Sequence, residues 1–105
     1  MRKLRQCEIA LISWMIKERI EAQYILPKLD TLMVEEMDDG GMGSLRVISV
    51  ENRFFSKELA QVDLYDQDGI LVVIGVYLDN NNDFFELDVW KVDNSPLIKF
   101  PKVPD

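Results

Sequence analysis

Hydrophobic residues in the first part of the chain recur at spacings of three and four, which is the period of an amphipathic helix. The stripe consists of Ile9, Ile12, Ile16 and Ile20. Neither glycine nor proline interrupts the run, so the pattern predicts a helix over residues 5 to about 22. Pro27 disfavours helical backbone in the residue before it, and the helix is therefore expected to end at or before Leu26.

From Thr31 onward the period shortens to the alternation typical of β-strands, and clusters of Asp, Asn and Gly separate the apolar runs. The strongest turn signals lie at residues 38–41, 66–69 and 79–83. They leave predicted strands at residues 32–37, 44–50, 59–65, 70–78 and 84–92. The run 70–78 is so apolar that it is expected to be a central strand covered on both faces.

These elements predict a fold of class α+β, in which the N-terminal helix packs on an antiparallel β-meander of about five strands. The length of 105 residues fits a single domain over residues 1–105. Proline has no amide proton for a sheet ladder. Because Pro96, Pro101 and Pro104 follow the last strand, the end of the chain is expected to be an extended tail over the surface.

The last predicted strand combines aromatic and acidic residues. In a regular strand, successive side chains point to opposite faces. One face is then expected to carry Phe84, Glu86, Asp88 and Trp90. The other face, expected to turn toward the helix-covered core, carries Phe85, Leu87, Val89 and Lys91. The first set predicts a surface on which two carboxylates lie between two large aromatic rings.

This surface has three interpretations. It suits an Arg or Lys side chain of a partner, held by charge-assisted hydrogen bonds and cation–π contacts. The residues expected to contact such a partner are Glu86, Asp88 and Trp90, with Asp39 and Asp93 at the rim. Two carboxylates on one face can instead share a proton or a metal ion. In the third interpretation they only keep a solvated strand soluble, paired with Arg46 or Lys57.

The formal net charge is −7. Nucleic-acid binding is not expected, because it needs clustered basic side chains and this chain carries them scattered. A basic protein partner is favoured electrostatically, although the same charge also serves simply to keep a small protein soluble. No apolar run is long enough to span a bilayer, so no membrane association is expected. The single cysteine, Cys7, fits a reducing, cytoplasmic location.

The chain contains no histidine. This excludes the commonest general base and any Ser-His or Cys-His nucleophile pair. With one cysteine as well, a zinc site of the usual kind cannot be assembled within one chain. Neither a phosphate-binding Gly loop nor a dinucleotide fingerprint is present. We therefore expect no catalytic residues, no metal site and no cofactor, and an enzyme is the less favoured class.

The turn Asp66–Gly69 has the Asp-x-Asp-Gly spacing of a calcium-binding loop. An EF-hand loop also needs a bidentate Glu at its twelfth position. That position, counted from Asp66, is Tyr77. The segment is therefore interpreted as a hairpin turn built from Asp and Gly.

Four parts of the sequence together resemble a family of small bacterial domains of unknown function. They are Arg2-Lys3-Leu4 with Glu8, residues 39–45 (DGGMGSL), Asp66–Gly69, and residues 86–93 (ELDVWKVD) with Ser95-Pro96-Leu97. The resemblance covers almost the whole chain. It implies a single intact domain from a bacterium but no established activity, so no catalytic residue is carried over. In size and charge the chain is also similar to immunity proteins of bacterial toxin systems, by analogy rather than descent.

Three functions follow from these observations. The leading expectation is a non-enzymatic protein-binding module, in its most concrete form an immunity-type neutraliser of a basic toxin domain. The alternative is a ligand-binding or carboxylate-dependent enzymatic domain that uses the face of Glu86, Asp88 and Trp90 as a groove. The third is a homodimer with a structural role, in which the aromatic face is the self-interface.

Overall fold

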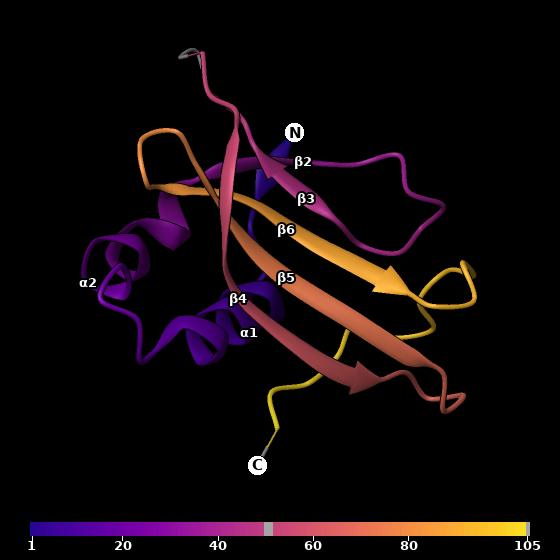
Figure 1. Ribbon diagram of the computed structural model, residues 1–105. Helices are drawn as coiled ribbons and strands as arrows, with labels where there is room; N and C mark the ends of the chain where they lie inside the picture. The colour runs from indigo at the N-terminus through magenta and orange to yellow at the C-terminus, as the bar shows by residue number, and fades with distance from the viewer. Residues whose placement is uncertain (50–51, 105) are drawn as a thin grey trace.

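The computed structural model describes residues 1–49 and 52–104 (Figure 1). Within them the helical elements are α1 (Gln6–Ile16), α2 (Ala22–Ile25) and the 3-10 helix η1 (Leu26–Thr31). The strands are β1 (Arg2–Lys3), β2 (Met33–Glu36), β3 (Leu45–Val47), β4 (Phe55–Tyr65), β5 (Leu71–Asp79) and β6 (Phe84–Lys91). The predicted α+β class is confirmed. The expected end of the second predicted strand, at Val50, lies outside the described residues.

α1 is shorter than the helix that the isoleucine spacing predicts. Ile12 and Ile16 are fully buried, whereas Ile20 is 74% exposed. The chain leaves the helix after Ile16, where the amide of Arg19 donates to the Ile16 carbonyl oxygen at 2.8 Å. This turn changes the direction of the chain, and α2 then supplies the next fully buried residue, Ile25. The prediction for Ile20 is wrong because the helical period does not continue through the turn.

Local chemistry fixes both ends of the helical region. At its start, the carboxylate of Glu8 accepts a hydrogen bond from the amide of Arg5 at 2.7 Å, which satisfies a donor that the helix itself leaves free. At its end, Pro27 lies in the first turn of η1 and α2 stops at Ile25. Proline is tolerated there because the first turn needs no amide proton from it.

The sheet is antiparallel throughout, with the strand order β1-β2-β3-β6-β5-β4 in the described residues. β4, β5 and β6 form the expected meander, and β2 and β3 form a hairpin. However, β3 pairs with β6 and not with β4. The chain after β3 therefore leads from the middle of the sheet to its far edge. β1, which is too short to show a period in the sequence, was not predicted.

A β-bulge interrupts the alternation at the start of β6. Tyr77 of β5 lies opposite Glu86, but the next residue, Leu78, lies opposite Phe84, which leaves Phe85 as an extra residue. Phe84 consequently joins the core, with 1% exposure, and Phe85 does not belong to the core cluster. The predicted faces of these two phenylalanines are therefore wrong, because an extra residue inverts the alternation beyond it.

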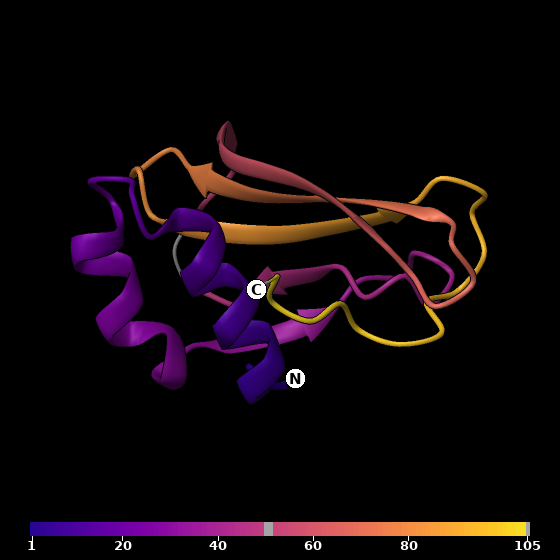
Figure 2. The ribbon, with the colours of Figure 1, turned by 90° about the horizontal axis from the view of Figure 1, so that it is seen from below.

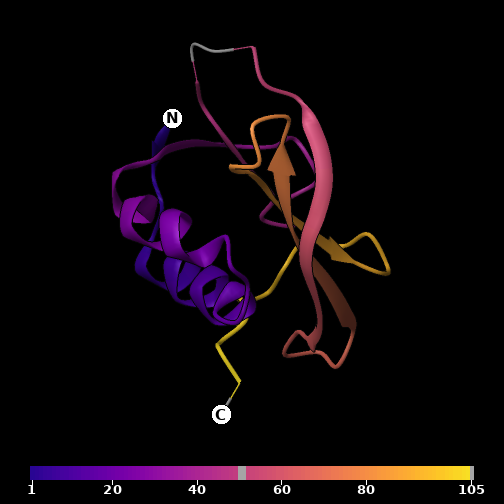
Figure 3. The ribbon, with the colours of Figure 1, turned by 60° about the vertical axis from the view of Figure 1, so that its left-hand side comes forward.

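The helices and the C-terminal segment lie on one side of the sheet (Figures 2 and 3). Their apolar side chains meet those of the strands in one core, which includes Leu11, Ile12, Ile16, Ile25, Leu29, Val34, Val72, Ile74, Val76, Leu78, Phe84 and Leu87. No described segment covers the opposite side, which we call the outer face. β5 lies inside the sheet as predicted, but it is covered on one face only.

The C-terminal segment is fastened to the helix side of the sheet. The carboxylate of Asp66 accepts hydrogen bonds from the amides of Ile98 at 2.7 Å and Lys99 at 3.3 Å. Leu97 and Phe100 pack against the core. The expected extended tail is therefore present, and it is held down by side-chain-to-backbone hydrogen bonds.

Candidate functional site

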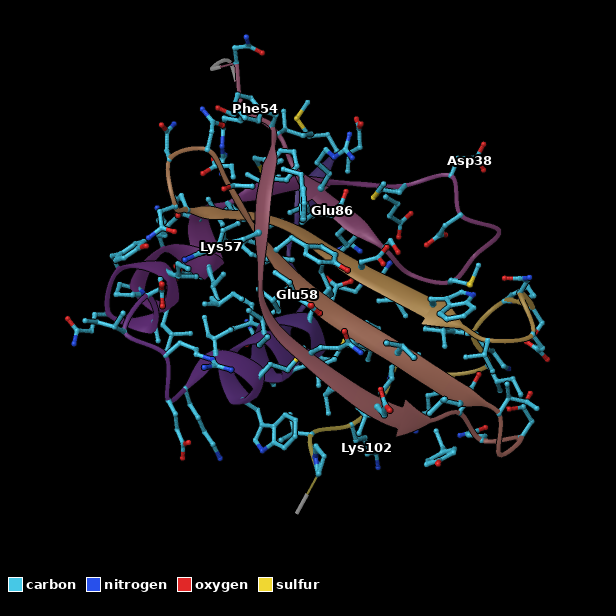
Figure 4. All side chains as sticks on the ribbon, in the orientation of Figure 1. Asp38, Phe54, Lys57, Glu58, Glu86 and Lys102 are labelled. Atoms are coloured by element: carbon cyan, nitrogen blue, oxygen red, sulfur yellow. The ribbon has the colours of Figure 1, made fainter. Side chains whose placement is uncertain are left out.

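The outer face carries one row of side chains that crosses five strands. From β4 to β2, the Cα partners are Glu58, Tyr77, Glu86, Arg46 and Glu35. Residues directly opposite one another share a face, so their side chains are neighbours. Figure 4 labels Glu58 and Glu86, both on the side turned to the viewer. This row places an aromatic ring between carboxylates.

The next rows continue the same chemistry toward the end of β6. One row consists of Gln61, Gly75 and Asp88, and the following row of Asp63, Val73 and Trp90. In these three rows the outer face carries five carboxylates, from Glu35, Glu58, Asp63, Glu86 and Asp88, against the guanidinium of Arg46. The ammonium of Lys3, opposite Met33 in β2, lies on the same face at its far end. Glu86, Asp88 and Trp90 thus lie together, as the alternation predicts.

Glu86 is the most tightly held carboxylate of this face. It accepts hydrogen bonds from Arg46 Nη2 at 2.8 Å and Nε at 3.2 Å, and its side chain is only 13% exposed. The Arg46 guanidinium also lies 5.3 Å from the centroid of the Phe85 ring, on which it stacks. Part of the negative charge of Glu86 is therefore neutralised within the chain.

Asp88 is held more loosely. Its only hydrogen bond among the described residues is a long one, 3.4 Å from Ser44 Oγ. The same hydroxyl lies 3.2 Å from the Val89 carbonyl oxygen and accepts the Val89 amide at 2.8 Å. A hydroxyl carries a single proton. Because the shorter contact is to Val89, the Asp88 carboxylate keeps acceptor capacity for a ligand.

Tyr77 forms an aromatic platform at the centre of the face. A Cβ atom on Gly75 would lie 3.0 Å from the Tyr77 hydroxyl oxygen and 3.1 Å from Cζ, so only glycine lets the ring lie down along the strand. Burial raises the pKa of Tyr77, and the carboxylates of Asp88, Glu58 and Glu86 raise it further. Alternation along the chain does not predict this platform, although a glycine inside an apolar strand is a recognised signal of close approach.

Two further aromatic rings lie on the outer face. Phe55 meets Tyr77 edge to face, with 5.3 Å between ring centroids and 75° between ring planes. Trp90 is 47% exposed, and its indole Nε1 donates to Asn94 Oδ1 at 3.0 Å. That bond fixes the orientation of the indole at the end of β6. The rings therefore present apolar surface without depending on a partner for their position.

Asp39 and Asp93, the two predicted rim residues, hold turns. Asp39 accepts the amides of Met42 at 3.0 Å and Ser44 at 2.9 Å. Burial raises its pKa, but these bonds outweigh burial and hold the pKa below its ordinary value. Asp93 accepts the amide and the hydroxyl of Ser95, which lower its pKa. Asp39 borders a pocket of about 270 Å³ beside Glu8, so it lies away from the outer face.

The acidic turn Asp66–Gly69 contains a buried ion pair. Lys91 Nζ donates to Asp66 at 2.9 Å and to Asp68 at 2.7 Å, and the lysine is 1% exposed. Its ammonium lies between the two carboxylates. The predicted hairpin turn is confirmed by the backbone, since the Gly69 amide donates to the Asp66 carbonyl oxygen at 2.9 Å between the paired strands β4 and β5. Among the described residues, no group of three or more His, Cys, Asp or Glu side chains is placed to hold a metal ion.

Residues 1–101 match the profile of one protein family, described as "Domain of unknown function (DUF6984)". The chain belongs to this family. No curated protein and no solved structure matches it. The DUF6984 match spans all four sequence segments that carried the family resemblance.

Two of these DUF6984 segments, residues 39–45 and residues 86–93 with Ser95-Pro96-Leu97, meet at one end of the sheet. The amide of Leu97 donates to the Gly41 carbonyl oxygen at 3.2 Å, and a Cβ on Gly41 would lie 3.3 Å from Pro96. The amide of Lys91 donates to the sulfur of Met42 at 3.2 Å. These contacts hold the Gly-rich loop, the end of β6 and the C-terminal segment together. The residues of these sequence segments therefore have a structural role in the fold.

No helix in the described part of the DUF6984 chain is long and apolar enough to cross a membrane.

Proposed function

We propose that this domain is a non-enzymatic protein-binding module, and that its outer face receives a basic segment of a partner protein. The observation that supports the proposal is the composition of this uncovered face. Its three central rows combine five carboxylates with one guanidinium, and the aromatic rings of Phe55, Tyr77 and Trp90 lie on the same face. Aromatic surface supplies apolar burial, and the carboxylates select a cation.

The centre of the face suits an Arg or Lys side chain. A cation above the Tyr77 ring is attracted by the ring, and the neighbouring carboxylates of Asp88 and Glu58 add charge-assisted hydrogen bonds. Arg46 already shows this geometry inside the chain, because it contacts both Glu86 and the Phe85 ring. The proposed partner contact repeats that arrangement between two chains.

A second copy of the chain fits this face less well than a basic partner. Two outer faces brought together would oppose their excess carboxylates, and like charges across an interface are costly. The structural homodimer therefore has less support than the partner-binding module. Sedimentation at micromolar concentration separates the two, because the module is expected to sediment as a monomer.

A basic toxin domain is the first partner class to test. The resemblance to small bacterial domains and the acidic charge of the chain both support this choice, and the chain would then act as an immunity-type neutraliser. Opposite charge would speed the encounter of such a pair. The proposal of partner binding does not depend on that identity, since any protein that presents an exposed basic segment meets the same chemistry.

Replacing Glu86 and Asp88 together by alanine is expected to weaken partner binding by about 30-fold or more, because both carboxylates lie beside the central platform. The measurement is capture from a lysate of the source organism at low and then moderate salt. It is followed by a titration of the captured protein against the wild-type and variant domains.

The matched control replaces Glu18 and Asp30 by alanine. It removes the same charge from two exposed residues outside the sheet, in the helix-side layer. If the control weakens binding as much as the double variant, net charge alone drives association and the assignment to the outer face is refuted. Unchanged affinity in a correctly folded Glu86/Asp88 variant has the same consequence.

A further inference from the structure

We propose a second interaction surface, the free edge of β4, which receives an extended segment of a partner protein as an added strand. β4 is the last strand of the sheet, and among the described residues it pairs with β5 alone. Figure 1 shows it at the border of the sheet with α1 behind it. Main-chain hydrogen bonds carry this inference, and of the outer-face carboxylates only Asp63 contributes to it.

The register identifies which backbone groups point outward. The amide of Asp66 donates to the Ile70 carbonyl oxygen at 3.0 Å, which marks a hydrogen-bonded position between the two strands. Such positions alternate along an antiparallel pair. The residues of β4 that bond to β5 are therefore Leu64, Val62 and Ala60, opposite Val72, Ile74 and Val76. The residues between them, Gln61, Asp63 and Tyr65, direct their amide and carbonyl groups away from the sheet.

The pairing of β5 with β6 gives the same result. The amide of Val92 donates to the Leu71 carbonyl oxygen at 3.0 Å, so the odd-numbered residues of β5 bond to β6. The even-numbered residues of β5 therefore form their backbone hydrogen bonds with β4. No hydrogen bond from another described segment reaches the backbone of Gln61, Asp63 or Tyr65. Their three amides and three carbonyls form an unused template for one more strand.

The two halves of the edge differ. Register shifts disturb the ladder between Phe55 and Lys57 and again between Glu58 and Ala60. Bulges of this kind protect an edge against pairing. From Ala60 to Tyr65 the ladder is regular. An added strand is therefore expected at residues 61–65.

Two hollows follow the inner side of this regular half. One, of about 390 Å³, is lined by Gln61 and Val62 together with Trp14 and Met15. The other, of about 520 Å³, is lined by Leu64 and Tyr65 with Phe100, Pro101 and Val103 of the C-terminal segment. In an added strand, the side chains opposite Val62 and Leu64 face inward. Each would enter one of these hollows, where apolar side chains form part of the wall beside charged ones, Glu18 and Arg19 in the first hollow and Lys99 and Lys102 in the second.

The chemistry of the edge defines the segment that fits. Its two inward residues are apolar, to match the apolar part of each hollow, Val62 with Trp14 in one and Leu64 with Phe100 in the other. The residue between them lies opposite Asp63 on the outer face, where a Lys or Arg makes a favourable cross-strand pair. The fitting segment thus alternates polar, apolar, basic, apolar and polar residues in extended conformation.

A second copy of the chain fits this edge poorly. When the three outward residues of one copy pair with those of another in antiparallel fashion, Gln61 lies opposite Tyr65 and Asp63 lies opposite Asp63. Directly opposed like charges destabilise a pair of strands. The charge of Asp63 therefore favours a basic partner segment over self-association.

The experiment titrates the full chain with the peptide acetyl-Thr-Ile-Lys-Ile-Thr-amide and follows backbone amides by NMR. In the free protein, the amides of Gln61, Asp63 and Tyr65 are expected to exchange with solvent at least about tenfold faster than those of Val62 and Leu64. Peptide at millimolar concentration is expected to shift the three outward amides and to slow their exchange. The same peptide with the lysine amide N-methylated is the control, because it keeps the side chains and blocks the ladder.

Asp63→Pro and Asp63→Ala give a matched pair of variants. Both remove the carboxylate, but only proline removes the outward amide proton, and it leaves the bonds to β5 in place. Affinity for the peptide is expected to be about tenfold lower in Asp63→Pro than in Asp63→Ala. The Glu86/Asp88 double variant is expected to bind the peptide as the wild type does, which separates this edge from the outer face.

Several results would overturn the proposal: no binding up to millimolar peptide, equal binding of the N-methylated peptide, or shifts confined to the outer-face residues of β5, β6 and β3. Protection of the three outward amides in the free protein, rising with protein concentration, would identify a second copy as the occupant and would also overturn it.

Discussion

Replacing Asp66 by asparagine is expected to lower the melting temperature by about 10–20 °C. The side chain keeps its size but loses its charge, so the buried ammonium of Lys91 retains only the half-exposed carboxylate of Asp68. Removing one partner of a buried ion pair usually costs about 3 kcal/mol or more, because the other charge stays out of water. Thermal unfolding followed by circular dichroism measures the shift.

Asp68→Asn is the matched control. Asp68 contacts the same ammonium at 2.7 Å, but its side chain is 36% exposed, whereas that of Asp66 is fully buried. We therefore expect a loss of only a few degrees for this variant. Equal effects of the two substitutions would contradict the assignment of the buried pair. In Asp66→Asn, faster exchange of the Ile98 and Lys99 amides would also report release of the C-terminal segment.

The stability contributed by Asp66 also depends on pH. Burial alone raises the pKa of this carboxyl. The bonds from the Ile98 amide, the Lys91 ammonium and the Gln67 and Lys99 amides outweigh burial and hold the pKa well below its ordinary value. A depressed pKa stabilises the fold fully above the unfolded-state pKa of about 3.9, and this stabilisation is lost as pH falls through the folded value. The gap between wild type and Asp66→Asn is therefore expected to be constant near neutral pH and to narrow below about pH 4.

This ion pair also shows which features a sequence pattern can and cannot predict. The acidic turn at Asp66 and the inward position of Lys91 both follow from local patterns. Their contact does not, because it depends on the pairing of β5 with β6, which places Lys91 opposite Val72. A charged residue at the end of an apolar set is the only local hint that a buried partner exists.

On the outer face, too, some features follow from the local sequence pattern and others depend on strand pairing. Glu86, Asp88 and Trp90 share a face because alternation is a local property of a strand. The platform of Tyr77 on Gly75 and the ion pair of Glu86 with Arg46 require the neighbouring strands to be known. Strand order is set by the whole core, so the pairing of β3 with β6 could not be predicted from short turns.

The bulge at Phe85 predicts a large difference in stability between alanine variants of Phe84 and Phe85. Replacing Phe84 by alanine is expected to lower the free energy of unfolding by about 3–5 kcal/mol, because Phe84 lies in the core opposite Leu78 and its removal leaves a cavity. Phe85→Ala is expected to cost about 2 kcal/mol or less. The Phe85 ring is also largely shielded from solvent, but two guanidiniums cover it in place of core side chains. Those of Arg46 and Arg53 lie 5.3 Å and 5.9 Å from the ring centroid.

Urea denaturation of the two variants decides between the bulge and a regular strand. Unbroken alternation from Trp90 back to Phe84 would place Phe85 in the core and predicts the opposite order of the two losses. Arg53 stabilises the bulged backbone, since its Nη2 donates to the Phe84 carbonyl oxygen at 2.6 Å. If Phe85→Ala caused the larger loss in the free energy of unfolding, β6 would be regular and Phe84 would lie on the outer face. The Phe84 ring would then be part of the aromatic surface around Tyr77.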